Sequence, residues 1–486
     1  MLLNEFFKDA PAIEISQLSC DSRMPMKDAI FFCVKGIRDD GHQFVKDAII
    51  NGAKVIVYED DIDTSLNAVF IRVSNVLDVL NKVADRFYGY PADSMETYIV
   101  SGCRGRSSVT SFINQLISRY RKCGSIGIMG ISYSGHWLMN SYSTLPVLSN
   151  LSYLSAMKED DVEACTFEAS PLNLAYKKLT SVHPDVFIYT STSLQAQDYK
   201  ELGNDYYNFL RKYFYTLEEN TLVIFNRDDP SFEELRDAPA KYLTYGFDEE
   251  ADFRIYDINI RHTGTSFALR YKGKNVIISS PLLGVDNVYN LTAAISGLVA
   301  MGYDLESLVN EIATIKPVEG IYDRLDDPDY HIITDAAYTL DSIRDIFDFG
   351  RYLTPKKNKL IAMVGINYTD DAKRLEGLSA LANKYLDMLI ITEDDSYEHD
   401  TLSILNRMKD YDLSCRSLII EDRENAIEEG IELLNRGDMF LLIGKGNEVS
   451  LYKGLGREYY EGDKKIAGMY LKKRKEEEEN ETFEVY

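Results

Sequence analysis

Short apolar runs alternate with amphipathic helical segments along the whole chain, and this alternation predicts an α/β fold. The first part carries the runs AIFFCVKG from Ala29 and AKVIVYE from Ala53, with a helical segment between them. The stretch YGYPADSM from Tyr88 has the Gly and Pro residues that are typical of a linker. We therefore expect a small first domain at residues 1–95.

Two larger parallel sheets are expected after this linker. The runs ACTFEAS, PDVFIYTS and TLVIFN, followed by a helix expected to start at Leu291, indicate a central domain at residues 96–317. Beyond Pro317 the pattern restarts with YHIITDAA, KLIAMVGI, DMLIIT and MFLLIG, each followed by a segment of helical spacing. This repetition is typical of a Rossmann-like sheet, which we assign to a third domain at residues 318–486.

The central domain opens with YIVSGCRGRSSVTSFINQLISRYRKCG, residues 98–124, which has the layout of strand, Gly-rich loop and helix. Gly102 and Gly105 punctuate the turn, and Gly124 stands where a left-handed helix cap is expected. Such a loop directs backbone N–H groups and the positive end of a helix dipole at an anion. A phosphate loop normally continues with Lys and then Ser or Thr, but here the pair is Arg106-Ser107.

Charge and cysteine usage narrow the function classes. Asp and Glu outnumber Lys and Arg 78 to 53, so the net charge is -25 and nucleic acid is disfavoured as a partner. The 6 cysteines are scattered without CxxC spacing, which indicates reduced thiols and a cytoplasmic protein. No stretch approaches the roughly 20 apolar residues that a membrane span needs.

Several separated segments together resemble the Mur ligases, most closely the MurE type, which adds the third residue of the peptidoglycan stem peptide. These segments keep the family's order across nearly the whole chain: CDSR (20–23), DDGHQF (39–44), STLP (143–146), FEAS (167–170), FNRDD (225–229), NVYN (287–290), DAAYTLD (335–341), AKR (372–374) and GKGNE (444–448). The resemblance implies a three-domain architecture with a central P-loop-type sheet. It also implies an ATP-dependent ligase that works through an acyl-phosphate.

The resemblance further implies roles for individual residues. Nucleotide binding falls on Gly102, Gly105, Arg106, Ser107, Ser108, Asn287, Asn290, Asp335, Lys373 and Arg374. Arg106 and Lys445 take catalytic roles, and Ser107 and Glu168 are the expected ligands of Mg²⁺. A UDP-N-acetylmuramoyl-peptide or related precursor is expected at Ser22, Arg23, His42, Thr144, Ser170, Lys178 and Asp394.

Each of these assignments has a structural alternative. Arg23 is then one half of an ion pair, and Glu168 is an exposed acid at a strand end. The two asparagines only cap a helix, and Lys373-Arg374 is the solvated start of another.

The chain departs from the family's pattern where charge must be neutralised. The loop Lys is Arg106, a paired Asp and His fall on Gln195 and Ala196, and the carbamylated Lys that positions a second Mg²⁺ aligns with Leu210. Family histidines are replaced by Leu172, Tyr338 and Asn447. The Arg-bearing DNPR clamp for the carboxylate of a diamino acid reads Asp394 to Tyr397.

Two hypotheses remain open. The first is a MurE-like pseudoenzyme with an impaired centre, which binds a UDP-linked precursor, a nucleotide or another cell-wall synthesis protein. The second is an active ATP-dependent amide ligase with a rebuilt centre and an altered amino-acid substrate.

Overall fold

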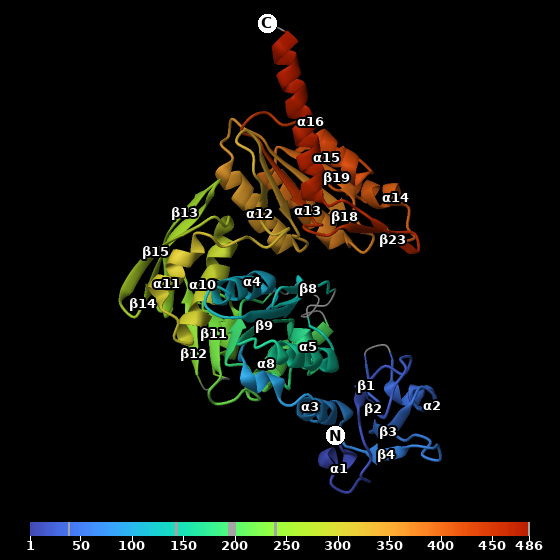
Figure 1. The fold of residues 1–486 in the computed structure, drawn as a ribbon. Coiled ribbons are helices and arrows are strands. Elements are labelled where there is room, and N and C mark those ends of the chain that lie inside the picture. The colour runs from blue at the N-terminus through green and yellow to red at the C-terminus, as the bar shows by residue number, and fades with distance from the viewer. Residues whose placement is uncertain (37–38, 141–143, 193–200, 238–240, 485–486) are drawn as a thin grey trace. The chain divides into compact units, whose positions relative to one another are not determined.

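The computed structural model describes residues 1–36, 39–140, 144–192, 201–237 and 241–484 (Figure 1). The chain divides into two compact units. The first unit holds residues 1–255, 270–273 and 290–308, and the second holds 256–269, 274–289 and 309–486. Within the described ranges no helix has the length and apolar character that crossing a bilayer requires.

The first unit begins with a small parallel sheet. Its strands lie in the order β1 (Gln17–Ser19), β2 (Ala29–Phe32), β3 (Ala53–Tyr58) and β4 (Val69–Arg72). The helical elements of this region are α1 (Leu3–Phe6), η1 (Gly41–Phe44), α2 (Val45–Ile50), α3 (Val76–Phe87) and η2 (Pro91–Ser94). The two apolar runs of the sequence are the buried strands β2 and β3, as predicted.

Eight strands of an eleven-stranded sheet form the centre of the first unit, in the order β12-β11-β10-β5-β9-β6-β7-β8. Strands β12 to β6 are parallel, while the short β6-β7-β8 meander is antiparallel. The strands are β5 (Glu96–Ser101), β6 (Cys123–Gly127), β7 (Gly130–Tyr133), β8 (His136–Leu138), β9 (Ala164–Ala169), β10 (Val186–Tyr189), β11 (Leu222–Asn226) and β12 (Tyr242–Gly246). The helices are α4 (Arg106–Ile117), α5 (Val147–Glu159), α6 (Pro171–Ala175), η3 (Gly203–Asp205), α8 (Tyr206–Phe214) and α9 (Ser231–Leu235).

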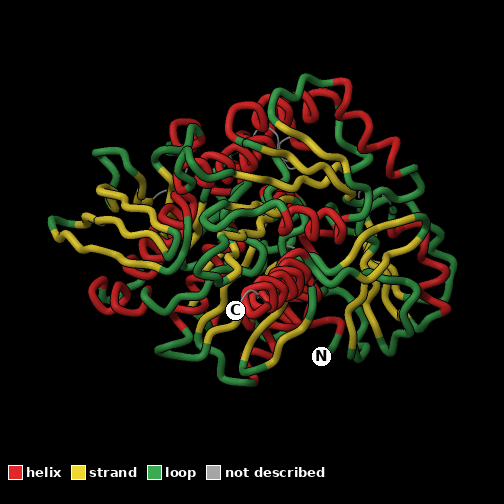
Figure 2. The backbone as a smooth tube through the Cα atoms, turned by 90° about the horizontal axis from the view of Figure 1, so that it is seen from above, coloured by secondary structure: helices red, strands yellow, loops and turns green. Residues whose placement is uncertain are grey.

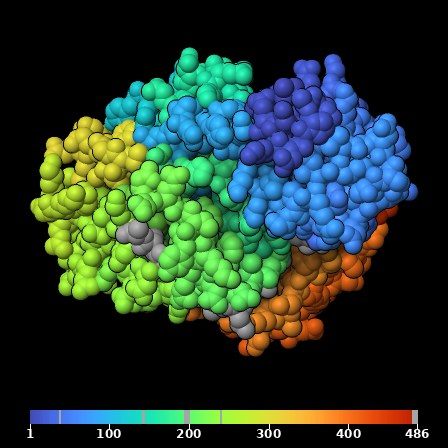
Figure 3. Space-filling view, turned by 90° about the horizontal axis from the view of Figure 1, so that it is seen from below, coloured from blue at the N-terminus to red at the C-terminus, as the bar shows by residue number. Residues whose placement is uncertain are grey.

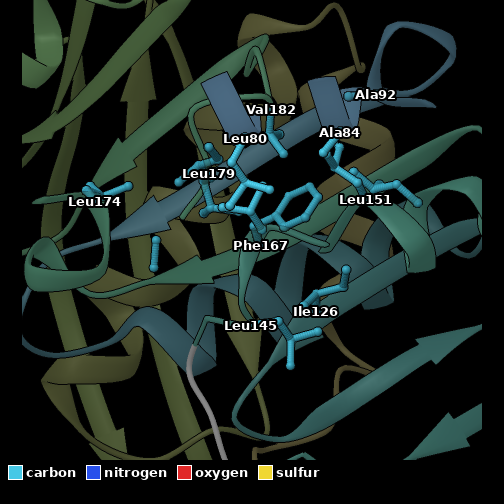
Figure 4. Packing of buried hydrophobic residues seen from close by; sticks show 14 of the residues in the cluster. Leu80, Ala84, Ala92, Ile126, Leu145, Leu151, Phe167, Leu174, Leu179 and Val182 are labelled. Atoms are coloured by element: carbon cyan, nitrogen blue, oxygen red, sulfur yellow. The ribbon is translucent and has the colours of Figure 1, made fainter. Parts of the chain in front are cut away.

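Helix α3 packs into the core of the first unit around Phe167 of β9. Figure 4 shows Leu80 and Ala84 of this helix beside Leu179 and Val182, with the Phe167 ring among them. Hydrogen bonds add to this packing. The side-chain amide of Asn81 donates to the carbonyl of Lys177 and accepts from the hydroxyl of Ser181. Figure 3 shows one face of the molecule, on which the N-terminal residues of the first unit are blue and later residues of the unit are green. This packing fixes the strand that ends in Glu168 and Ala169.

The second unit contains a six-stranded sheet in the order β16-β17-β21-β18-β19-β20, in which only the β16-β17 pair is antiparallel. The strands of this sheet are β16 (Asp323–Leu325), β17 (His331–Asp335), β18 (Leu360–Ile366), β19 (Met388–Glu393), β20 (Arg416–Ile419) and β21 (Met439–Ile443). A hairpin of β22 (Ser450–Lys453) and β23 (Gly456–Tyr459) follows. Its helices are α12 (Leu340–Leu353), α13 (Ala372–Tyr385), α14 (Thr401–Asn406), η4 (Arg407–Asp410), α15 (Arg423–Glu432) and α16 (Asp463–Glu484), the last seen end-on in Figure 2.

The division into two units runs through one further stretch of the sequence, residues 253–312. Its elements are β13 (Phe253–Arg261), β14 (Gly264–Tyr271), β15 (Lys274–Ser280), α10 (Gly284–Ala300) and α11 (Leu305–Ile312). Helix α10 begins at Gly284, so the start predicted at Leu291 is wrong. Asn287 and Asn290 are therefore inside the helix and do not cap it. The apolar residues Leu282 and Leu283 are buried just before Gly284, whose φ of 84° turns the chain into the helix.

The prediction for Gly124 is also wrong. Helix α4 already ends at Ile117, and Gly124 lies in β6. A Cβ at this position would stand 2.6 Å from the sulfur of Met157. The glycine therefore allows a close approach between β6 and α5, and it does not cap a helix.

A buried ion pair holds α15 and α16 of the second unit together. The guanidinium of Arg423 donates to both carboxylate oxygens of Asp463 at 2.8 and 2.7 Å, and both side chains are 0% exposed. The remaining donors reach the carbonyls of Glu393 and Ile443, while the hydroxyl of Tyr460 also donates to Asp463. All of these groups are satisfied, which is the condition under which a buried charge pair is tolerated.

We expect Arg423→Met to lower the free energy of unfolding by about 3–5 kcal/mol, because it leaves the Asp463 carboxylate buried and unpaired. Urea unfolding followed by circular dichroism measures this change. Arg344→Met, which removes an exposed pair with Asp341, is the matched control and should shift the midpoint little. Equal effects of the two substitutions would contradict the assignment.

Candidate functional site

The Gly-rich loop between β5 and α4 has the predicted strand, loop and helix geometry. Gly102 and Gly105 have φ values of 128° and 80°, a region that favours glycine. A Cβ at Gly102 would stand 2.3 Å from Oγ1 of Thr190, and one at Gly105 would stand 2.2 Å from Oδ1 of Asn290. No side chain caps the start of α4 at Gly105. The helix N-terminus therefore has the form of an anion site.

Backbone and hydroxyl contacts pin this loop to the end of β10. The N–H of Cys103 donates to the carbonyl of Ser191 at 2.8 Å, and the N–H of Arg104 donates to the Ser191 hydroxyl at 3.2 Å. The hydroxyl of Thr190 donates to the carbonyl of Arg104 at 2.5 Å. The loop is therefore held in its conformation by the protein, without any ligand.

Arg106, the residue in place of the usual lysine, turns back onto its own loop. Its guanidinium donates to the carbonyl of Gly102, and Nε lies 3.4 Å from Oε1 of Glu168. Glu168 is 3% exposed, and its second oxygen accepts from the N–H of Ile128 at 3.2 Å. The expected metal ligand is thus already paired with a positive charge of the same chain.

A small polar cavity of about 110 Å³ lies between α4 and the β6-β7 hairpin. Ser107 and Glu168 both line it, together with Thr110 on the next turn of the helix. The volume is well below the ~300 Å³ at which small-molecule pockets begin. Ser108, by contrast, is buried and is not among the lining residues.

Three of the predicted substrate residues lie close to the end of β9. The hydroxyl of Thr144 donates to the carbonyl of Glu168 at 2.9 Å, and Nζ of Lys178 lies 3.5 Å from the carbonyl of Thr144. The hydroxyl of Ser170 caps α6 by accepting from the N–H of Asn173. Burial lowers the pKa of Lys178. Thr144 therefore links Lys178 to the backbone of Glu168 at the end of β9, and Ser170 lies two residues after Glu168.

In the N-terminal sheet, His42 is held by the protein on both ring nitrogens. Nδ1 lies 2.6 Å from the carboxylate of Asp40, and Nε2 accepts from the N–H groups of Glu59 and Asp60 at 3.1 and 3.2 Å. The side chain is only 6% exposed. No local pattern around His42 points to these partners, because Glu59 and Asp60 belong to a distant segment.

Arg23 and Ser22 differ sharply in exposure. The Arg23 side chain is 86% exposed and forms a two-pronged contact with Asp21, whose pKa the guanidinium lowers to about 2. Ser22 is buried, and its carbonyl accepts from the side chain of Asn51. Of the three residues expected to hold a UDP group, only Arg23 presents its side chain to solvent.

Asp40, His42 and Asp60 stand close enough to share a metal ion. Lys35 already places its ammonium 2.8 Å from Asp60 and 2.9 Å from Glu59. This acidic group is therefore charge-compensated from within the fold.

The nucleotide residues predicted in the second unit are engaged in local contacts. Asp335 is buried at the end of β17 and accepts from the N–H groups of Tyr322 and Ala337 at 2.7 and 2.8 Å. Burial raises the pKa of Asp335 to about 7. The side chain of Asn287 donates to the carbonyl of Leu283, the residue just before α10, at 2.8 Å.

Lys373 and Arg374 open α13, but only one of them is exposed. Nε of Arg374 lies 2.6 Å from the buried carboxylate of Asp370, and its guanidinium lies 4.1 Å from the centre of the Tyr338 ring. The hydroxyl of Tyr338 donates to the same carboxylate at 2.8 Å. Lys373 points to solvent.

Lys445 is the centre of a polar cluster beyond the ends of β19 and β21. Its side chain is 2% exposed, and Nζ lies 2.8 Å from Asp394, 2.7 Å from Asp395 and 3.1 Å from Glu448. Lys445 and neighbouring Arg423 hold the pKa of Asp394 below its usual value against the opposing effect of burial. The structure thus brings together Lys445 and Asp394, two residues predicted for different roles.

Three of the altered positions were expected at the metal site, and the structure describes one of them. Leu210 is completely buried in the core of the first unit, so it presents nothing to a metal. Gln195, Ala196 and Ser143 lie outside the described residues. The sequence analysis missed the tyrosines that surround Tyr397, although 34 tyrosines in the chain were a signal of aromatic surfaces.

Comparison with known proteins relates the chain to the Mur ligases. Three family models match it: the Mur ligase family catalytic domain at residues 14–88, the Mur ligase middle domain at 100–298, and the Mur ligase glutamate ligase domain at 323–446. Two curated relatives are UDP-N-acetylmuramoyl-L-alanyl-D-glutamate–2,6-diaminopimelate ligases. The one from Syntrophomonas wolfei is 28% identical and covers 94% of this chain and 95% of its own length. The one from Clostridioides difficile is 27% identical and covers 95% and 96%.

Solved structures have the same fold. A 2,6-diaminopimelate ligase aligns with a TM-score of 0.72 at 22% identity over 98% of this chain and 99% of its own. The MurF ligase of Thermotoga maritima, in complex with ADP, aligns with a TM-score of 0.63 at 18% identity over 95% and 98%. With the three family models in order along the chain, the protein belongs to the Mur ligase family and has its three-domain architecture.

Proposed function

We propose that this protein is a MurE-like member of peptidoglycan precursor metabolism that binds a UDP-linked muramoyl peptide and a nucleotide but turns ATP over much more slowly than a Mur ligase. The observation that carries the proposal is the contact of Arg106 with Glu168 and with the Gly102 carbonyl. It separates binding, which depends on loop geometry, from catalysis, which depends on available positive charge.

The loop is suited to hold phosphate groups. Its shape is set by Gly102 and Gly105 and by contacts to the end of β10, and the Arg106 guanidinium adds one contact, to the Gly102 carbonyl. The helix N-terminus attracts an anion through its N–H groups and dipole. When bound, ATP supplies the phosphoryl group that activates a carboxylate in this family. The support from relatives is the ADP complex of the Thermotoga maritima MurF ligase.

Phosphoryl transfer requires positive charge that acts on the transferring group, and this is where the chain is weak. A planar guanidinium does not replace a compact ammonium in a fixed slot. Arg106 is also paired with Glu168, so its positive charge is compensated within the protein. Because Glu168 is already paired with Arg106, a Mg²⁺ ion does not fit beside it while Arg106 stays in place. The proposed function therefore does not depend on that ion.

The polar residues near the end of β9 are the proposed contact with the precursor in the first unit. Thr144, Ser170 and Lys178 gather at the end of the same strand. The lowered pKa of Lys178 indicates a half-buried ammonium whose charge is only partly solvated, and such a group gains from an anionic partner. Arg23 supplies a second, exposed cation in the N-terminal sheet.

An active ligase with an altered amino-acid substrate is the second candidate. Two observations favour it: the curated relatives are named as ligases over nearly their whole length, and the buried cluster around Lys445 is fully paired and ordered. In this case Arg106 must leave Glu168 when ATP binds. The cytoplasm is the compartment in which either activity is proposed.

The first test compares rates of ATP hydrolysis, measured with UDP-N-acetylmuramoyl-dipeptide and a panel of amino acids. We expect the natural protein to be at least about 10²- to 10³-fold slower than the typical enzyme turnover of ~10 s⁻¹, the cost of one missing transition-state contact. Arg106→Lys should restore little, because Leu210 stays in the core. Arg236→Lys, at an exposed pair with Glu233, is the control. Turnover near ~10 s⁻¹ by the natural protein would favour the active ligase.

The second test separates ligand binding from stability in the N-terminal sheet. Arg23→Ala should weaken the binding of UDP-N-acetylmuramic acid in calorimetry and leave the melting temperature nearly unchanged, because this side chain is exposed. His42→Phe should cost about 1–3 kcal/mol of stability, because two buried backbone donors lose their acceptor. His42→Gln, which keeps an acceptor, is the matched variant. A stable His42→Phe protein that no longer binds the ligand would overturn the structural role of His42.

A further inference from the structure

Four aromatic side chains form one continuous group on the second unit, beside the Lys445 cluster. Tyr397 and Tyr452 are stacked with ring centres 5.3 Å apart and planes at 13°. Tyr368 meets Tyr397 edge-on at 5.2 Å, and it stacks on His399 at 4.7 Å. The three tyrosines are 36–39% exposed. We call this group the tyrosine shelf.

The backbone holds Tyr397 in a strained conformation to present its ring. Its φ is 48°, which a non-glycine residue rarely adopts. The N–H of Tyr397 donates to the carbonyl of Tyr452 at 2.9 Å, and its carbonyl accepts from Gly454 at 2.7 Å. Strain that the surroundings enforce in this way clusters at ligand-binding sites.

The shelf already accepts one cation of the chain. The guanidinium of Arg457, opposite Tyr452 in the β22-β23 hairpin, lies 5.7 Å from the centre of the Tyr452 ring. This distance is within the ~6 Å of a cation–π contact. A tyrosine face that holds a guanidinium from one side chain has the chemistry to hold a guanidinium or ammonium from a ligand.

The charge beneath the shelf favours a cation. The Asp395 carboxylate accepts from the N–H of Tyr452 at 3.0 Å and is one of the partners of Lys445. In this cluster the ammonium groups of Lys445 and Lys453 contact four carboxylates, those of Glu393, Asp394, Asp395 and Glu448, and Arg423 is a third cation near Asp394. Asp395 also contributes to the raised pKa of Tyr397, after burial.

A cavity beside the shelf gives room for a small molecule. It measures about 270 Å³ and is lined by Tyr368, His399 and Asp400, among others. Arg407 also lines it, but its guanidinium is turned to the carbonyls of Tyr368 and Asp370. The volume is close to the ~300 Å³ at which small-molecule pockets begin.

We propose that the tyrosine shelf binds a small organic cation, a compound with an ammonium or guanidinium group and no carboxylate beside it. The cation lies on the tyrosine faces and displaces Arg457, while the rest of the molecule enters the adjacent cavity. Because Tyr397 ends the segment that aligns with the family's carboxylate clamp, the proposal rests on the proposed function for the kind of site. Binding of a cation there can nevertheless be measured without the nucleotide loop of the first unit, so the two can fail separately.

Agmatine is the probe, and 4-hydroxybutylurea is its uncharged control of similar shape. Ligand-observed NMR titration of the full chain at low salt should give saturable binding of agmatine in the millimolar range and no saturation with the urea. Tyr452→Leu and Tyr368→Leu should each weaken agmatine about two- to fivefold, the effect of one exposed cation–π contact. Tyr352→Leu, at an exposed tyrosine of α12, is the matched control and should leave binding unchanged.

Arg457→Gln gives the sharpest result, because it removes the resident guanidinium and keeps the hairpin. Agmatine should then bind two- to fivefold more tightly. The melting temperature of each variant verifies folding, and the Arg457→Gln arm does not require the loss of any ring. Equal binding of agmatine and the urea, unchanged binding in both tyrosine variants, or weaker binding in Arg457→Gln would overturn the proposal.

Discussion

The contact between Arg106 and Glu168 is the interaction on which the proposed function depends. One side chain begins the helix of the phosphate loop, and the other ends the neighbouring strand of the central sheet. The register of β5 and β9 places Val100 opposite Glu168, so the pair follows from strand alignment. In the function proposed above, this contact compensates both charges, so that neither group is available for phosphoryl transfer. The loop keeps its shape, and the electrostatic part of the site is spent.

The same principle applies to the other predicted cations. Arg23 is paired with Asp21, Arg374 with Asp370, and Lys445 with Asp394 and Asp395. In a chain with 78 acidic and 53 basic residues, a carboxylate lies beside each of these three cations. An anionic ligand must therefore compete with these carboxylates, and it gains most where the competing pair is exposed, as at Arg23.

The sequence predicted the strands well because they are short, apolar and buried on both faces. AKVIVYE and KLIAMVGI are β3 and β18, and the loop at Gly102 has the expected form. The start of α10 was missed because its first turn contains polar residues whose partners are local. The double engagement of His42 was missed because its acceptor contacts come from Glu59 and Asp60, which only the sheet brings near.

Pairing between residues far apart in the sequence explains the other features that could not be predicted. Arg423 and Asp463 are 40 positions apart and are both fully buried, and no local pattern marks either as a core residue. The tyrosine shelf likewise combines rings from the segments after β18 and β19 and from β22. In each case the sequence shows which charged or aromatic side chains are present, and the fold determines which groups they contact.

The Mg²⁺ dependence of ADP binding tests the central claim most directly. Calorimetry on the full chain gives the dissociation constant of ADP with excess Mg²⁺ and with a chelator. If Arg106 holds Glu168, the ion gains no protein ligand there, and the two constants should agree within about threefold. Tightening by Mg²⁺ of tenfold or more, about 1.4 kcal/mol, would mean that Glu168 is available to the metal and that Arg106 does not occupy the site.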